Sequence, residues 1–280
     1  MKRLLIAIAF LAVSMAAKAQ DPDSVAFVNA DWKITELERG AEAMYASIPM
    51  FNSIQSVCVI KYPARKFRTE ILPREGKQAD IPSRIGKEVG AAFVLNAGYF
   101  NMKNLTSAVY FRVGDIVYGQ THPSEASRVD GVIAFKDKKG RKVLIAKSDT
   151  TQYDEVAGKC HTVLATGPTL IIKDEIVASP YIENSFYSGR HPRTAFGTDR
   201  NGNIYMVVID GRFPGQADGA TIWETARICR LLGMTDASNL DGGGSSAIWN
   251  SKDGVINHPS DNKKFNHKGE RKVPNMIVTY

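Results

Sequence analysis

Short apolar runs separated by glycine-bearing turns dominate the chain from residue 50 onward. Apolar, often β-branched runs between turn signals are typical of strands. The predicted strands and hairpins are SIQSVCVIKYP (53–63), FRTEILP (67–73), GAAFVLNAGYF (90–100), GVIAFKDKKGRKVLIA (131–146), TVLATGPTLIIKDEIV (162–177) and FGTDRNGNIYMVVID (196–210). The pair at 162–177 is interrupted at Gly167 and Pro168, and the last hairpin turns at Asn201 and Gly202. This pattern predicts a β-rich core.

Two segments carry helical features instead. DGATIWETARICRLLG (218–233) places Thr221 and Glu224 in the spacing of a capping box, and Gly233 supplies a C-terminal stop. ITELERGAEAMYASI (34–48) is predicted as a helical stretch within a polar leader. We therefore expect an α+β fold, with a mixed, mostly antiparallel β-sheet core and a few packed helices in a single main domain.

The first 19 residues have the order of a secretory signal peptide. Lys2 and Arg3 precede an apolar run, and small residues lead to a predicted cleavage after Ala19. The run is too short for a stable membrane span, and no later segment approaches one. We expect an exported protein, periplasmic or secreted. Residues 20–89 are expected to form a leader and first strands, and 90–280 the functional domain, joined into one unit with 50–89.

The charge and the cysteine content of the chain argue against some classes of function. Loss of the predicted signal peptide lowers the net charge from +7 to +4. No run dense in Lys and Arg remains, which argues against a nucleic-acid partner. Cys58, Cys160 and Cys229 allow at most one disulfide, and their settings favour buried free thiols. The spacing of Cys and His matches no metal-site pattern.

Polar side chains gather where predicted strands end. Asn96 follows AAFVL, Asp210 and Arg212 follow IYMVVI, and Asp241 follows ASNL in DASNLDGGGSSAIWN (236–250). Rigid scaffolds present functional groups at such ends. The three glycines after Asp241 carry an entropic cost, so this segment is a bare turn, an anion-binding loop or a nucleophile loop.

Several motifs, taken together and in this order, resemble the phosphodiester glycosidase family. They are NAGYF (96–100), TGPTL (166–170), RTAFGTD (193–199), VVIDGR (207–212), GATIWETARICRLLGMTDASNLDGGGSSAIW (219–249) and RKVPNMIVTY (271–280). The resemblance covers about residues 90–280 and implies hydrolysis of a sugar-1-phosphodiester at the sugar side, in a glycan or glycoconjugate. It implies no cofactor, and a metal requirement stays open.

The same resemblance assigns expected roles. Glycosidic bonds normally break between two carboxyl groups, and the leaving phosphate here needs charge stabilisation more than protonation. The expected catalytic carboxylates are Asp241, Glu224 and Asp210, and the expected substrate- and phosphate-binding residues are Arg193, Arg212, Asn96, Thr194, Gly242, Gly243, Gly244 and Ser245. The glycine backbone would act as an anion cradle. Which carboxylate serves as acid or base stays open.

Other interpretations remain. In one of them, Glu224 has no catalytic role and serves solely as the capping partner of Thr221. Ser245 followed by His258 or His267 has the chain order of a serine hydrolase, although that requires a strand before the serine and a helix after it. A non-catalytic glycan-binding domain would keep the fold without the chemistry. Asp199 fits a hairpin turn better than a calcium loop.

Overall fold

The computed structural model describes residues 21–148, 152–179 and 183–280. The predicted signal peptide and its cleavage site lie outside the described residues. Within these ranges the strands form an eight-stranded sheet, two five-stranded sheets and a two-stranded ribbon. Neighbouring strands in these ranges pair antiparallel, for example β3 with β16 and β5 with β20. The expected α+β class with a mostly antiparallel core is therefore confirmed.

Neighbouring strands in each sheet often come from distant parts of the chain. The large sheet runs β1 (Lys33–Glu36), β2 (Glu42–Met50), β3 (Ser53–Pro63), β16 (Asn203–Ile209), β15 (Arg193–Thr198), β17 (Asp236–Asn239), β13 (Thr169–Ile172) and β14 (Glu175–Ile176). The second sheet runs β11 (Val143–Lys147), β10 (Gly131–Phe135), β12 (Thr162–Thr166), β8 (Phe111–Val113) and β9 (Ile116–Gly119). The third runs β19 (Gly254–Val255), β18 (Ile248–Asn250), β5 (Phe93–Asn96), β20 (Asn275–Thr279) and β4 (Thr69–Pro73), and the ribbon is β6 (Phe100–Asn101) with β7 (Thr106–Ser107).

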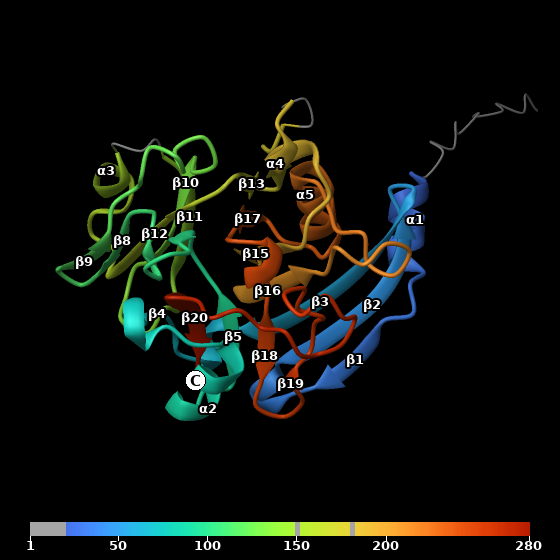
Figure 1. Ribbon diagram of the computed structural model, residues 1–280, viewed down its shortest axis with the longest axis horizontal. Helices are drawn as coiled ribbons and strands as arrows, with labels where there is room; N and C mark the ends of the chain where they lie inside the picture. Colours follow the sequence, from blue (N-terminus) through green and yellow to red (C-terminus); the bar gives the residue numbers. More distant parts are fainter. Residues whose placement is uncertain (1–20, 149–151, 180–182) are drawn as a thin grey trace, which may run out of the picture.

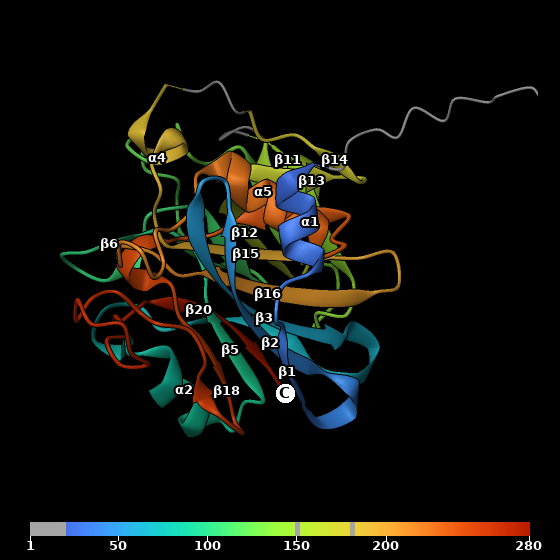
Figure 2. The same ribbon diagram turned by 90° about the vertical axis from the view of Figure 1, so that its right-hand side faces the viewer.

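The helices are short and lie around the sheets (Figures 1 and 2). They are α1 (Pro22–Val28), α2 (Pro82–Val89), α3 (Tyr153–Ala157), α4 (Ser185–Ser188) and α5 (Ile222–Leu231). Helices α1 and α5 pack with one face of the large sheet, whereas α2 lies against β5 and β18 of the third sheet.

Strand β3 shows why the large sheet is the central layer. Val57 and Val59 pack in a core cluster with residues of α5 and α1. Cys58, Ile60 and Tyr62, which point the opposite way, pack with residues of the two five-stranded sheets. Burial on both faces explains why this segment is a continuous apolar run rather than an alternating one.

The helix predicted for residues 34–48 is wrong. That segment forms β1, a short 3₁₀ turn at Glu38–Gly40 and β2. Strand β2 pairs with β3 over nine residues, and Ala46, Ile48 and Met50 are buried at alternate positions. Cross-strand pairing and burial outweigh the intrinsic helix preference of the alanine and glutamate residues here.

The other predicted elements are present, with one difference in pairing. The segments 131–146 and 196–210 form the hairpins β10–β11 and β15–β16. In 162–177, however, β12 and β13 join different sheets, and the cis peptide Gly167–Pro168 lies between them. The three cysteines are free and buried, as expected. No helix in the described ranges is long and apolar enough to cross a membrane.

Candidate functional site

A buried carboxylate, Asp210, lies where β16 ends between two sheets. Only 1% of the residue is exposed. Its oxygens accept hydrogen bonds from Ser56 Oγ (2.8 Å), Asn257 Nδ2 (3.1 Å) and the backbone N–H of His258 (2.9 Å). His258 Nδ1 lies 2.9 Å from Asp210 Oδ2. Burying an ionised carboxylate is costly unless it is paired in this way, so Asp210 ties the loop after β19 to the large sheet.

His258 is held on two sides. Its ring stacks on Phe265, with centroids 3.8 Å apart and planes 10° from parallel. Because Nδ1 faces Asp210, a proton on Nδ1 leaves Nε2 as the free acceptor. An aspartate that orients a histidine is a recurring element of acid–base sites. The sequence raised His258 only under the serine hydrolase interpretation.

A continuous hydrogen-bond path leads from Asp210 to Asp241. Asn257 Nδ2 also donates to the carbonyl of Ser246, and Thr194 Oγ1 lies 3.1 Å from Ser246 Oγ. Thr194 Oγ1 also donates to Asn96 Oδ1 (3.0 Å), and Asn96 Nδ2 donates to the carbonyl of Asp241 (2.6 Å). The path joins β15 and β16 of the large sheet to β5 of the third, and thereby brings together residues far apart in the sequence.

The side-chain amide of Asn96 is engaged by the protein at both ends. Its Oδ1 accepts from Thr194 Oγ1 and from the N–H of Ala247, and its Nδ2 donates to Asp241. Asn96 and Thr194 are both fully buried. The two residues therefore support the loop that carries Asp241.

Asp241 is partly exposed and follows β17. Burial raises the pKa of its carboxyl group to about 6, although the Ser245 hydroxyl and the Arg271 guanidinium act in the lowering direction. Glu125 acts to raise this pKa and Arg128 to lower it. Near neutral pH the group is mostly ionised, with a proton affinity well above that of an ordinary aspartate.

The glycine loop brings its backbone close to charged side chains. Gly243 has a φ of +63°, and a Cβ built there would lie 2.9 Å from Arg212 Nη2. A Cβ at Gly244 would overlap Arg271 Nη2. A Cβ at Gly242 would lie 2.6 Å from the carbonyl of Pro192. At Gly242 the obstacle is backbone, and at Gly243 the positive φ disfavours a side chain, whereas the atoms near Gly244 are the ends of the Asp261 and Arg271 side chains.

Arg212 is the exposed cation of this region. Its φ of +70° is uncommon for a residue with a side chain, which is a feature that clusters at functional sites. Its Nη1 lies 3.5 Å from Ser260 Oγ, and no described carboxylate lies within ion-pairing distance of it. An exposed guanidinium without an acidic partner, next to a glycine loop, is suited to bind an anion.

Arg193 is placed differently. It is 2% exposed, its Nε donates to the carbonyl of Ala220, and its Nη2 donates to the carbonyls of Phe186 and Gly189. Burial lowers the pKa of this guanidinium to about 10. Two of its three nitrogens are thus committed to the protein backbone.

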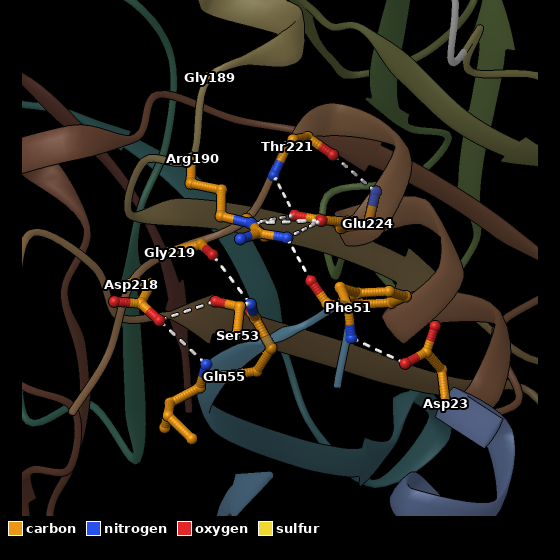
Figure 3. A network of polar contacts seen from close by, with 12 residues as sticks. Asp23, Phe51, Ser53, Gln55, Gly189, Arg190, Asp218, Gly219, Thr221 and Glu224 are labelled. Carbon is orange, nitrogen blue, oxygen red and sulfur yellow. Dashed lines mark hydrogen bonds and ion pairs between the residues drawn. The ribbon is translucent and has the colours of Figure 1, made fainter. Parts of the chain in front are cut away.

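Glu224 forms the capping box expected of it and an ion pair as well. Glu224 N donates to Thr221 Oγ1 (3.1 Å), and Thr221 N donates to Glu224 Oε2 (2.9 Å). Figure 3 shows Arg190 reaching across to the Glu224 carboxylate, with Nη2 2.7 Å from Oε1, and to the carbonyl of Phe51. Both carboxylate oxygens are occupied within this network.

Ser245 lies in a 3₁₀ turn (Gly243–Ser245), and the chain after it enters strand β18. A nucleophile elbow requires a helix after the serine, so this part of the serine hydrolase pattern is absent from the loop.

The described residues contain no group of three or more His, Cys, Asp or Glu side chains arranged to hold a metal ion. Asp199 caps the β15–β16 turn, where its Oδ1 accepts from the N–H groups of Asn201 and Asn203. That contact pattern agrees with the hairpin-turn interpretation.

Two residues of the site were not predicted from the sequence. Asn257 donates a hydrogen bond to Asp210, and the charge of Arg271 acts on Asp241. Asn257 and His258 follow the short strand β19, so the strand-end rule that selected Asp210 could also have found them. Arg271 stands in a loop without such a signal, where it pairs with Asp261 (2.6 Å).

Comparison with known proteins identifies relatives. A model of the phosphodiester glycosidase family matches residues 89–280. The Bos taurus protein N-acetylglucosamine-1-phosphodiester alpha-N-acetylglucosaminidase is 34% identical over 99 residues, which cover 35% of this chain. The match covers 18% of the bovine protein, so it spans less than a fifth of that relative's length.

Two solved structures share the fold. The zebrafish N-acetylglucosamine-1-phosphodiester alpha-N-acetylglucosaminidase catalytic domain, auto-inhibited by its pro-peptide, superposes with a TM-score of 0.61 at 16% identity, covering 89% of this chain and 81% of that one. A hypothetical protein from Synechocystis superposes with a TM-score of 0.63 at 16% identity, covering 89% of this chain and 63% of that one.

We predict that Asp210→Asn lowers the free energy of unfolding by about 1–3 kcal/mol, because an amide offers one acceptor oxygen where the carboxylate serves several donors. Ser56→Ala should cost less, since it removes one of these bonds. Urea unfolding of both variants measures this order. An Asp210→Asn loss no greater than that of Ser56→Ala would contradict the central role of the carboxylate.

Proposed function

The chain belongs to the phosphodiester glycosidase family, and from this premise we propose that it hydrolyses sugar-1-phosphodiesters at the sugar–phosphate bond. The bovine relative is named for N-acetylglucosamine-1-phosphodiester, so we propose an N-acetylglucosamine-1-phosphodiester within a glycan or glycoconjugate as the first substrate to test. The observation that carries this proposal is the partly exposed Asp241 carboxylate beside a glycine loop and the unpaired guanidinium of Arg212.

In the proposed reaction, Asp241 acts in its ionised form. The bond between the anomeric carbon and the phosphate oxygen breaks, and its electron pair leaves with the phosphate. Positive charge builds on the sugar, and the nearby carboxylate stabilises it. Water then supplies hydroxide to the anomeric carbon and releases a proton. The products are a free sugar and a phosphomonoester.

The leaving phosphate needs positive charge and hydrogen-bond donors more than it needs a proton. Arg212 supplies a charge-assisted contact beside Gly243. The N–H of Gly243 itself donates to the carbonyl of Pro192, so the donors that the loop would offer are the N–H groups of Gly242 and Gly244. Arg193 contributes its positive charge rather than hydrogen bonds from Nε and Nη2, because these two nitrogens are bound to backbone carbonyls.

Other site residues are proposed to act through their neighbours. Asp210 orients His258, and Asn96 and Thr194 position the loop of Asp241. Glu224, which the sequence offered as a catalytic carboxylate, is proposed as a positioning residue because Arg190 and Thr221 occupy both of its oxygens.

Export is proposed from the basic, apolar and small-residue order of residues 1–19. A mature N-terminus at Gln20, measured by mass spectrometry of the protein recovered from the producing cells, is the expected result.

We predict that Asp241→Asn lowers kcat for release of N-acetylglucosamine from its 1-phosphodiesters by at least about 100-fold, since electrostatic stabilisation of a transition state carries effects of that size. Free sugar and phosphomonoester are both measured. Asp115→Asn, an exposed aspartate in the β8–β9 turn, is the matched control and should keep full activity. Equal activity of the two variants would remove Asp241 from the mechanism.

The pH dependence should follow the ionisation of Asp241. The carboxylate is the active form, so kcat/KM should fall as the pH drops through about 6. Arg271 acts to lower this pKa, and Arg271→Gln should therefore move the acid limb to higher pH. Arg200→Gln, which removes a guanidinium paired with Asp174 instead, should leave the limb in place. An acid limb unmoved by Arg271→Gln would assign it to another group.

A further inference from the structure

The connection between β9 and β10 of the second sheet reaches the surroundings of Asp241. Arg128 lies on this connection, and its guanidinium carbon is 5.9 Å from the centroid of the Tyr99 ring. The Tyr99 hydroxyl accepts a hydrogen bond from Asn239 Nδ2 (2.9 Å), and Asn239 is the last residue of β17, two positions before Asp241. The second sheet therefore joins the large sheet and the third sheet around this carboxylate.

Gly167 and helix α4 hold the connection in place. A Cβ at Gly167 would lie 2.6 Å from the carbonyl oxygen of Arg128, so the close approach of the two backbones requires a residue without a side chain. On the other side, Tyr187 Oη donates to the carbonyl of Ser127 (2.6 Å). The motif TGPTL (166–170) thus helps to fix the connection beside Asp241.

Glu125 is the carboxylate that this connection brings to the site. Arg128 Nη1 lies 3.3 Å from Glu125 Oε2, and the Glu125 side chain is 16% exposed, so it is neither free in solvent nor sealed from it. The charge of Glu125 acts to raise the pKa of Asp241, as one carboxylate does to another nearby. The two carboxyl groups therefore lie close enough for their charges to interact.

The oxygens of Glu125 retain capacity to accept a proton. Oε2 is covered and accepts no hydrogen bond from the described residues, although it is ion-paired with Arg128. Oε1 makes a long contact with Ser124 Oγ at 3.3 Å. In Asp210 and Glu224, by contrast, both oxygens accept hydrogen bonds from protein donors. Glu125 is therefore less committed to the fold than either of these two carboxylates.

We propose that Glu125 is the second carboxylate of the reaction and acts as its general base. This inference rests on the proposed function, in which a water molecule releases a proton that requires an acceptor. The water transfers this proton to the Glu125 carboxylate while its oxygen forms a bond to the anomeric carbon. The bond to the phosphate oxygen breaks, its electron pair leaves with the phosphate, and Asp241 stabilises the positive charge on the sugar. Arg128 is a positioning residue that holds Glu125.

The first test measures hydrolysis of the methyl phosphodiester of N-acetylglucosamine 1-phosphate. Glu125→Gln should lower kcat by about 100-fold or more, because general acid–base groups contribute about 10²–10⁴-fold. Glu125→Asp keeps a carboxylate and should retain more of the activity than Glu125→Gln. Glu155→Gln makes the same change at an exposed position of α3 and is the matched control, which should keep full activity.

Azide separates a general base from a residue that only supports the fold. Azide is already an anion and needs no base, so it should raise the turnover of Glu125→Gly by about 10-fold or more. It forms a bond to the anomeric carbon as the phosphate leaves, and the products are a glycosyl azide and a phosphomonoester. The unmodified protein should still release free sugar in azide. Glu125→Ala is the second variant for this measurement if Glu125→Gly does not fold.

Two results would overturn the role of Glu125 while the proposed function stands. One is an unchanged kcat in Glu125→Gln, and the other is a lowered kcat in the glycine or alanine variant that azide does not restore. Failure of the unmodified protein to release sugar from the diester would overturn both the inference and the proposed function.

Discussion

The buried carboxylate of Asp210 is the constraint on which the rest of the site depends. A charge removed from water must be compensated by hydrogen bonds, and Ser56 of β3 and Asn257 and His258 of the loop after β19 supply them. These hydrogen bonds fix the path of the long irregular loop after β19, which regular strand pairing does not hold in place. The position of His258 is thus a consequence of the desolvation energy of one aspartate.

The same principle operates along the rest of the junction. Asn96 and Thr194 direct their polar atoms to each other and to the loop of Asp241, so side chains from β5 and β15 act as a substitute for strand pairing between sheets. Asp241 is left without equivalent compensation, and its raised pKa records that difference. The fully hydrogen-bonded groups hold the junction together, and Asp241 is the group that we propose to act on the substrate.

Much of the fold could be predicted because local pattern and tertiary environment agree. The run 53–63 is β-rich and lies buried between two layers, and the capping box of α5 is present at Thr221 and Glu224. The prediction for 34–48 was wrong because β2 forms a tight hairpin with β3, which turns at Phe51 and Asn52, and alanine and glutamate do not signal that pairing. The polar residues at strand ends could be predicted from the sequence. Whether each side chain is already hydrogen-bonded within the protein could not. Whether Glu224 is free or bound depends on Arg190, 34 residues away.

The location of the site between sheets also couples recognition to cohesion of the molecule. The residues around Asp241 and His258 come from layers whose mutual packing is otherwise apolar. A ligand at the proposed site would contact Arg212, which follows β16 of the large sheet, and the glycine loop, which leads into β18 of the third sheet. Its binding energy would add to the free energy that holds the layers together, so that each occupied site makes separation of the sheets rarer. The proposed site therefore lies where the two layers of the domain are joined.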